Sequence, residues 1–513
     1  MLNGITINKG QGGLGKPLEG TDYISGLLFY SASLPSGFSS GDRIKIVYSV
    51  EEGEALGILD THVGETAAVA KNVIGGTPAA GNTIKITYTG IEGLETVLAT
   101  YTLTSGDAAT TTTAAAAIAA AINAGTVTHG FSATNSTNSL LVTTKGGEGV
   151  FPNAGTPYAS TETGGGMTST WTQPTGSGST VLGVASDIDI LYYHVSEFFR
   201  LQPKGKLYVG VYATADVGTF ASVTLMQNFA QGAIKQMGVY YKSTSFATSA
   251  CTALQAQCTS LEAVHKPLIT ILGAEISGTT NVSSITADLH LLTAPQVSVT
   301  IGQDGANLGN HIFKATGKSV TNVGEMLGAV ALSSVSDSIA WFGKFQVSTT
   351  ELDTLAFANG ELYTTVSDST VTGLDTLGYC FLRKVMDLGG SYHNRPYTCV
   401  SLTSDYAFIH SNRTIYKAIK NIRTTVLPSV ASPIKVLADG TLSPDVINYF
   451  KSLGAQGLDV LLRNNEISNY AVIIDPAQDV LSTGILEITA QIQPIGVADF
   501  IDINIGFVTS ITS

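Results

Sequence analysis

The chain reads Gly484-Ile-Leu-Glu-Ile-Thr-Ala-Gln-Ile-Gln-Pro494 near its end and then, after a turn around Gly496, Ile501-Asp-Ile-Asn-Ile-Gly-Phe507. In both segments an apolar residue alternates with a polar or small one, which is the period of a β-strand with one apolar and one solvated face. A terminal strand of this kind has unpaired N–H and C=O groups until a sheet accepts it. We therefore expect these strands to pair in their own subunit or in a neighbouring copy, as in a protein that assembles through its ends.

The composition is poor in charge. Charged residues make up 13% of the 513 residues, against about 25% in average soluble domains. Gly, Ser, Thr and Ala take their place, which favours β-rich surfaces buried against neighbouring molecules, although a monomer with a Ser/Thr-rich surface is an alternative. The formal net charge of −13 argues against nucleic acid as the main partner, because phosphate binding requires a concentrated basic surface.

Targeting and redox signals are few. Residues 1–10 contain no basic segment followed by an apolar one, so we expect no signal peptide. No apolar run approaches the ~20 residues of a membrane helix, so we expect no membrane insertion. The four cysteines are expected to be reduced, buried residues of a protein made in the cytoplasm. They are Cys251, Cys258, Cys380 and Cys399.

A glycine-rich segment, Gly10-Gln-Gly-Gly-Leu-Gly-Lys16, matches the spacing of a phosphate-binding loop. Such a loop needs Ser or Thr after its lysine, to bind magnesium, and an N–H at the start of a helix. Pro17 provides neither, and no amphipathic helix follows. A flexible glycine arm is therefore favoured over a nucleotide site, and we expect no cofactor.

The chain between residues 60 and 180 differs in composition from the segments on either side of it. It is rich in threonine, lacks cysteine and has frequent glycine turns, which predicts a mostly β module inserted into a different fold. On either side of it, strands alternate with helices, which predicts a largely parallel sheet covered on both faces. The expected helices include residues 187–201, 220–236, 245–264, 282–292 and 320–332.

The last folded region begins near residue 397. A helix over residues 412–426 is predicted to have an apolar side and, on the opposite side, the cations Arg413, Lys417 and Lys420, with Arg423 at the edge. This row is either a solvated face or a surface that meets an acidic partner. Ser443 predicts the N-cap of a second helix that ends at Gly454, followed by strands over residues 458–463 and 470–474.

No catalytic constellation is visible. The eight histidines show no metal-binding spacing, and neither C-x-x-C nor G-x-S-x-G occurs, so we expect no enzyme. The most polar stretch of the second half is either a functional site or a structural segment whose polar groups are all hydrogen-bonded. It contains Asp387, His393, Arg395, Asp405 and His410. Cys380 and Cys399 are more typical of core residues than of nucleophiles.

Three stretches carry a resemblance to a known family. The first is the strand at residues 23–30 followed by Ile44-Lys-Ile-Val-Tyr-Ser-Val-Glu-Glu-Gly-Glu-Ala-Leu-Gly57. The second is Ile190-Leu-Tyr-Tyr-His-Val-Ser-Glu-Phe-Phe-Arg200 leading to Gly205-Lys-Leu-Tyr-Val-Gly-Val211. The third is the end, with Asn412-Arg-Thr, the helix after Ser443, Glu466-Ile-Ser, and Gly484 to Pro494 with its following strand. In this order and spacing, the chain resembles the contractile tail sheath proteins of bacteriophages and related injection particles.

The resemblance implies a structural role in a virion tail that assembles in the cytoplasm of a host bacterium. Sheath subunits stack as hexameric rings around a tail tube, contact baseplate and tail terminator proteins, and contract to drive the tube through a cell envelope. Here it implies that the basic helix with Arg413, Lys417, Lys420 and Arg423 faces the tube. It also implies that terminal arms add strands to neighbouring copies. The arm residues would be Ile5, Ile7, Leu486, Ile488, Ile492, Ile501, Ile503, Ile505 and Phe507.

The expected fold class is thus a multidomain α+β and α/β protein. It would have a parallel-rich α/β middle domain, an α+β C-terminal domain with strand-exchanging arms, and an inserted mostly β module. The expected divisions are an arm at 1–20, a middle domain at 21–59 with 181–395, an outer module at 60–180, a C-terminal domain at 396–483 and an arm at 484–513. The alternatives are a β-rich surface or virion protein without contraction, and a nucleotide-binding enzyme that uses Gly10 to Lys16.

Overall fold

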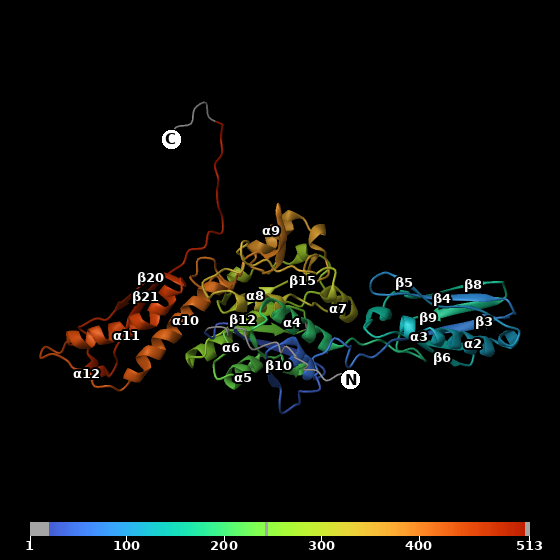
Figure 1. The fold of residues 1–513 in the computed structure, drawn as a ribbon, viewed down its shortest axis with the longest axis horizontal. Coiled ribbons are helices and arrows are strands. Elements are labelled where there is room, and N and C mark those ends of the chain that lie inside the picture. Colours follow the sequence, from blue (N-terminus) through green and yellow to red (C-terminus); the bar gives the residue numbers. More distant parts are fainter. Residues whose placement is uncertain (1–19, 242–244, 508–513) are drawn as a thin grey trace, which may run out of the picture. The chain divides into compact units, whose positions relative to one another are not determined.

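The computed structural model describes residues 20–241 and 245–507 (Figure 1). By its internal contacts the chain separates into two units. We call residues up to 332 together with 339–407 the N-terminal unit, and residues 333–338 together with those from 408 onward the C-terminal unit. Each unit is described by itself.

A six-stranded sheet organises the N-terminal unit, in the order β14-β12-β11-β1-β10-β2. Five strands run parallel and β2, at one edge, is antiparallel to β10. The strands are β1 (Ile24–Ser31), β2 (Ile44–Val47), β10 (Lys206–Ala213), β11 (Gln236–Tyr240), β12 (Ile269–Gly273) and β14 (Val297–Thr300). All eight residues of β1 are buried, as expected for a parallel strand covered on both faces.

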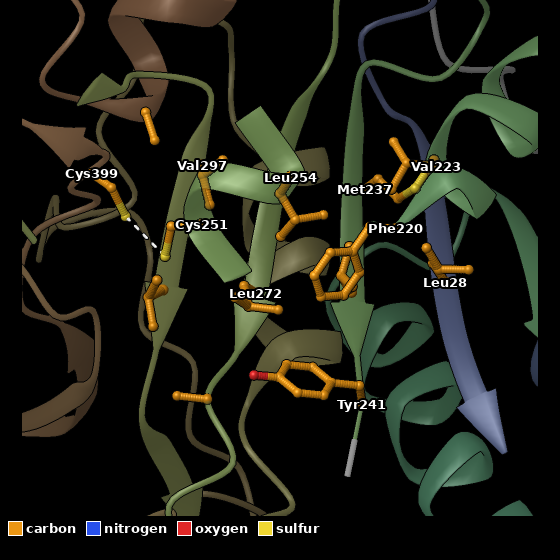
Figure 2. Close-up of a cluster of buried hydrophobic side chains, with 14 of the residues drawn as sticks. Leu28, Phe220, Val223, Met237, Tyr241, Cys251, Leu254, Leu272, Val297 and Cys399 are labelled. Atoms are coloured by element: carbon orange, nitrogen blue, oxygen red, sulfur yellow. Dashed lines mark hydrogen bonds between the residues drawn. The ribbon is translucent and has the colours of Figure 1, made fainter. Parts of the chain in front are cut away.

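Helices cover both faces of this sheet. Residues of α5 (Ala221–Phe229) and α6 (Thr248–Ala263) form one buried apolar cluster with Leu28, Met237 and Leu272 from the strands (Figure 2). On the other face, α8 (Val323–Leu332) lies against β11. Gly238 permits this approach, because a Cβ there would lie 2.7 Å from the Val323 side chain.

The remaining elements of the N-terminal unit surround this core. The helices are α1 (Val50–Ala55), α4 (Asp187–Leu201), α7 (Leu308–Thr316) and α9 (Asp368–Thr376). Short two-stranded sheets pair β13 (Thr293–Ala294) with β19 (Cys399–Val400), β15 (Gly302–Asp304) with β16 (Leu355–Phe357), and β17 (Leu382–Val385) with β18 (Leu388–His393). Single 3-10 turns lie at Thr214–Asp216, Val282–Ser284, Leu289–Leu291 and Tyr363–Thr365.

The segment between α1 and α4 has its own core. It forms a four-stranded sheet, β6-β7-β3-β9, and a three-stranded sheet, β5-β4-β8, with α2 packed against several of the strands. Its aromatic centre is Tyr88, Phe131, Tyr158 and Trp171. The bounds are β3 (Val69–Gly76), β4 (Thr83–Thr89), β5 (Glu95–Thr102), α2 (Thr111–Ala124), α3 (Thr126–His129), β6 (Ser132–Ser136), β7 (Ser139–Thr143), β8 (Tyr158–Thr163) and β9 (Met167–Thr172), with 3-10 turns at Asp107–Ala109 and Phe151–Asn153.

The C-terminal unit consists of two long helices and a hairpin. The helices are α10 (Ile409–Val426) and α11 (Pro444–Arg463), with the 3-10 turn Leu427–Ser429 after α10 and the short α12 (Val480–Thr483). The hairpin pairs β20 (Ile467–Ile473) with β21 (Thr489–Pro494) in antiparallel register. Two apolar clusters lie between these elements.

The structure has the predicted mixed α/β character, and four of the expected segments differ. The predicted helix at 220–236 ends at Phe229, because Gln231 and Gly232 have positive φ and turn the chain into β11. Residues 282–292 form only two 3-10 turns, because the N–H groups of Val282 and Leu289 donate to Glu361 Oε2 and to the Leu377 carbonyl.

The other two differences lie in the C-terminal unit. Helix α11 continues through Gly454 to Arg463, so residues 458–463 are helical. Gly454 is not a cap: a Cβ there would lie 3.0 Å from Val472, and the glycine lets β20 pack closely. Residues 501–507 form no strand within the part of the chain that is described.

Candidate functional site

The hairpin of β20 and β21 is a sheet with open edges. Six residue pairs align the strands, from Ile467 with Pro494 to Ile473 with Thr489. Among the described residues this sheet has two strands only, so each strand has one edge without a strand partner. Such an edge presents the N–H and C=O groups that a further strand needs.

One face of the hairpin packs inside its own unit. Tyr470, Val472 and Ile492 lie against Leu458 and Leu461 of α11. The Tyr470 hydroxyl donates to Asp459 Oδ1 at 2.5 Å, and this hydrogen bond raises the pKa of Tyr470. The hairpin is therefore anchored to the helices while its edges are open.

Three residues predicted for the C-terminal arm belong to this packed region. Ile492 lies in the cluster just described, and Leu486 and Ile488 pack against the second cluster around Phe450. In the single chain these three side chains therefore contact their own unit: Ile492 because β21 pairs with β20, and Leu486 and Ile488 because they pack against the Phe450 cluster.

The segment after β21 is different. Ile503 and Ile505 are 74% and 91% exposed, and Ile501 and Phe507 are also exposed. The segment keeps the alternation seen in the sequence, with Asp502 and Asn504 between the apolar residues. Within the described part of the chain, no strand pairs with this segment and its apolar side chains are exposed, so it is available to add to a sheet. Ile5 and Ile7, and the glycine-rich segment from Gly10 to Lys16, lie outside the described residues.

The predicted row of cations on α10 divides into two halves. Arg413 is buried and donates to Ser333 Oγ at 2.7 Å and to the Ser334 carbonyl at 3.1 Å. Lys417 Nζ lies 2.5 Å from Glu466 Oε1. Lys420 and Arg423 are exposed. The four side chains are therefore not one uniform exposed row, and the half with Arg413 and Lys417 has structural partners inside the unit. Glu466 was missed as a partner of Lys417, because 49 residues separate them and no local pattern connects them.

The polar stretch at 387–410 is divided: Asp387 and Asp405 are exposed, Arg395 is half-buried, and His393 is buried. His393 Nε2 lies 3.0 Å from Glu325 Oε1, and both side chains are buried. Burial lowers the pKa of His410 to about 4, with a smaller effect from Arg413. Cys380 and Cys399 are buried free thiols.

Within residues 20–241 and 245–507, no group of three His, Cys, Asp or Glu side chains could hold a metal ion, and no helix is long and apolar enough to span a membrane.

Two family models match the chain. The model described as "DUF2586, N-terminal domain" matches residues 2–395, and the model described as "DUF2586, C-terminal domain" matches residues 405–512. The chain belongs to the DUF2586 family. Comparison with curated proteins gave no match.

Several solved structures are similar to this DUF2586 chain. The helical sheath of the anti-feeding prophage in its contracted state has a TM-score of 0.44 and 15% identity over 62% of this chain and 81% of its own. The sheath of the PVC extracellular contractile injection system, also contracted, has a TM-score of 0.41 and 13% identity over 62% and 80%. The sheath tail protein Lin1278 from Listeria innocua has a TM-score of 0.40 and 10% identity over 93% and 96%.

Proposed function

We propose that this chain is the structural subunit of a contractile tail sheath. Its copies would polymerise as stacked hexameric rings around a tail tube and contract to drive the tube through a cell envelope. One observation carries the proposal: the C-terminal unit contains both an open edge of the β20–β21 hairpin and a separate exposed apolar segment, residues 501–507. The sheath-like order of motifs in the sequence supports it further.

The proposed mechanism is strand addition between copies. Residues 501–507 of one subunit would pair with an edge of the β20–β21 hairpin of the next, because main-chain hydrogen bonds and alternate side-chain contacts suit an extended donor. Such a connection can persist while rigid bodies rotate, so a lattice could shorten without coming apart. In this proposal Ile5 and Ile7 belong to a second arm at the other end of the chain.

The remaining assignments follow from the same proposal. The tube-facing surface would be the exposed half of α10, with Lys420 and Arg423, because a weak and screened charge contact can be released when the sheath contracts. Residues 60–180 would form an outer module, with the middle domain at 21–59 and 181–395 and the C-terminal domain at 396–483. The further partners would be baseplate and tail terminator proteins, in a virion tail assembled in the host cytoplasm. The work of contraction would come from the lattice and not from catalysis.

Deletion of residues 497–513 tests the proposal. The hairpin ends at Pro494, so the truncated chain should fold and stay monomeric, while the full chain forms hollow cylinders visible by negative-stain electron microscopy. Tubes formed by the truncated chain would refute strand addition by this segment. Discrete monomers of the full chain across salt and concentration would refute the sheath and favour a structural protein without contraction.

A matched pair of point variants sharpens this test. I503D combined with I505D places charge on the apolar face of the segment, and D502S combined with N504S changes only its polar face. The first pair should abolish cylinders and the second should leave them unchanged. Equal effects of both pairs would refute a strand with one buried face.

A further inference from the structure

The N-terminal unit contains an acidic cleft that the proposed strand addition does not use. Its volume is about 520 Å³, and it lies between α1, α4 and the segment before β16. Four carboxylates line it, and Arg200 is the cation among its described lining residues. The carboxylates belong to Glu51, Asp60, Glu197 and Glu351.

Arg200 is already committed to partners within the unit. Its Nε and Nη2 atoms contact the two carboxylate oxygens of Glu197 at 2.9 and 2.6 Å, and its Nη1 donates to the Val347 carbonyl at 2.7 Å. A bidentate pair of this kind neutralises one carboxylate. Arg200 makes no such bidentate pair with Glu51, Asp60 or Glu351, although its charge lowers the pKa of Glu351.

Two polar atoms among the lining residues lack a hydrogen-bond partner in the described structure. They are Glu351 Oε2 and the hydroxyl of Tyr193, and both atoms are buried. Tyr193 is only 1% exposed. Gly309 makes room for this phenol, because a Cβ at that position would lie 2.9 Å from the hydroxyl oxygen. Buried polar atoms are almost always satisfied, so an ordered water or a ligand group is expected to complete these two acceptors.

The electrostatics of the cleft point to a cation. Burial raises the pKa of Glu351, and the neighbouring Asp304 raises it further. Burial also raises the pKa of Glu197 despite its pair with Arg200. Burial disfavours the charged form of both carboxylates, and a bound cation would favour it.

We propose that this cleft binds the cationic side chain of a lysine or arginine from a second copy of this chain. An ammonium or guanidinium group donates several hydrogen bonds, which suits the carboxylate of Glu351 and the phenol oxygen of Tyr193 as acceptors. The inference rests on the proposed self-assembly.

Charge complementarity favours a second copy as the source. Arg463, at the end of α11, has a side chain that is 81% exposed. Copies with a net charge of −13 repel one another, and a cation placed in an acidic cleft offsets part of this repulsion.

A binding experiment on the full chain tests the cleft itself. The probe is butylguanidine, which carries an arginine-like cation, and its neutral control is butylurea. We expect calorimetry to detect butylguanidine binding by the wild type and at least a tenfold loss in E351Q, with a smaller loss in Y193F. The control variant D353N should bind like the wild type, because Asp353 is exposed and pairs with Lys384. No binding by the wild type, or equal binding by E351Q, would overturn the proposal.

An assembly experiment tests the second copy as the source. E351Q should raise the critical concentration for cylinders about tenfold in a pelleting assay, butylguanidine should inhibit wild-type assembly, and D353N should assemble normally. If E351Q assembles like the wild type, the second-copy assignment is wrong and the sheath proposal stands. If the wild type forms no assemblies, both the sheath proposal and the second-copy assignment are wrong.

Discussion

Lys417 and Glu466 form an ion pair inside the C-terminal unit, with 2.5 Å between Nζ and Oε1 and with 15% and 7% of their side chains exposed. The pair connects α10 to the residue just before β20. It gives Lys417 a structural role that the sequence-based interpretation of a tube-facing row did not include.

Removal of one member of this pair should destabilise the C-terminal unit. K417M removes the ion-pair partner of the largely buried Glu466 carboxylate, and loss of one partner of a buried ion pair costs roughly 3–5 kcal/mol. The measurement is urea unfolding followed by circular dichroism. K420M is the control on the same helix, where an exposed side chain should change stability by less than about 0.5 kcal/mol. Equal stability of K417M and the wild type would contradict a structural role for the pair.

Tube attachment should depend on the exposed half of α10. We expect K420E combined with R423E to weaken co-sedimentation of cylinders with the tail tube, most strongly at low salt, because screened surface charges act over about 10 Å at 0.1 M ionic strength. K435E, another exposed cation of the C-terminal unit, is the control. Loss of cylinders in the double variant itself would indicate a role in self-assembly instead.

The contact between α10 and α11 should not tolerate a side chain at Gly457. A Cβ there would lie 2.9 Å from the Ile422 backbone, which cannot move as a side chain can. G457A should therefore cost about 1–3 kcal/mol of stability. G373A, within α9, is the control: nothing lies within 4 Å of its Cβ, so it should stabilise by about 0.5–1 kcal/mol. A neutral G457A would refute the close packing of the two helices.

Local patterns predicted the elements whose signals are local. Helix α4 has the predicted bounds, because the Ser186 side chain accepts from the Ile188 N–H, acidic residues occupy its first turn and apolar residues follow at helical spacing. The strands of the central sheet were predicted for the same reason, since β-branched and aromatic residues form short apolar runs between turns.

Contacts between distant segments account for most of what was missed. From the sequence, Gly454 predicts the end of a helix. The structure shows that it lies in the middle of α11, where the absence of a side chain leaves room for Val472 of β20. The Lys417–Glu466 pair and the acidic cleft around Tyr193 also combine residues that lie far apart in the chain. The apolar alternation at 486–492 and at 501–507 looks alike in sequence, but only the first segment has an internal partner, β20 or the cluster around Phe450.

Acid should destabilise the N-terminal unit through His194. Burial lowers the pKa of this histidine to about 3, whereas an unfolded histidine titrates near pH 6.5. As the pH falls, the unfolded chain therefore binds the proton before the folded chain does. The free energy of unfolding is unaffected by this histidine above pH 6.5 and decreases by on the order of 4 kcal/mol as the pH falls toward 3. The measurement is urea unfolding at pH 7.5, 5.5 and 4.5. H194F, which keeps a ring beside Tyr240, should show a shallower pH dependence; an unchanged slope would contradict the assignment.

The four thiols should be unreactive while the chain is folded. All four are buried, and burial raises the pKa of Cys258 and of Cys380 to about 12, so little thiolate is present at neutral pH. Cys251 and Cys399 lie with their sulfur atoms 3.9 Å apart, as reduced thiols (Figure 2). We expect Ellman's reagent to modify none of them within minutes at pH 8 and all four in guanidinium chloride. Rapid modification of the native chain would show that the cluster in Figure 2 opens readily. Fewer than four thiols after denaturation under non-reducing conditions would show that a disulfide had formed, with Cys251 and Cys399 as the nearest pair.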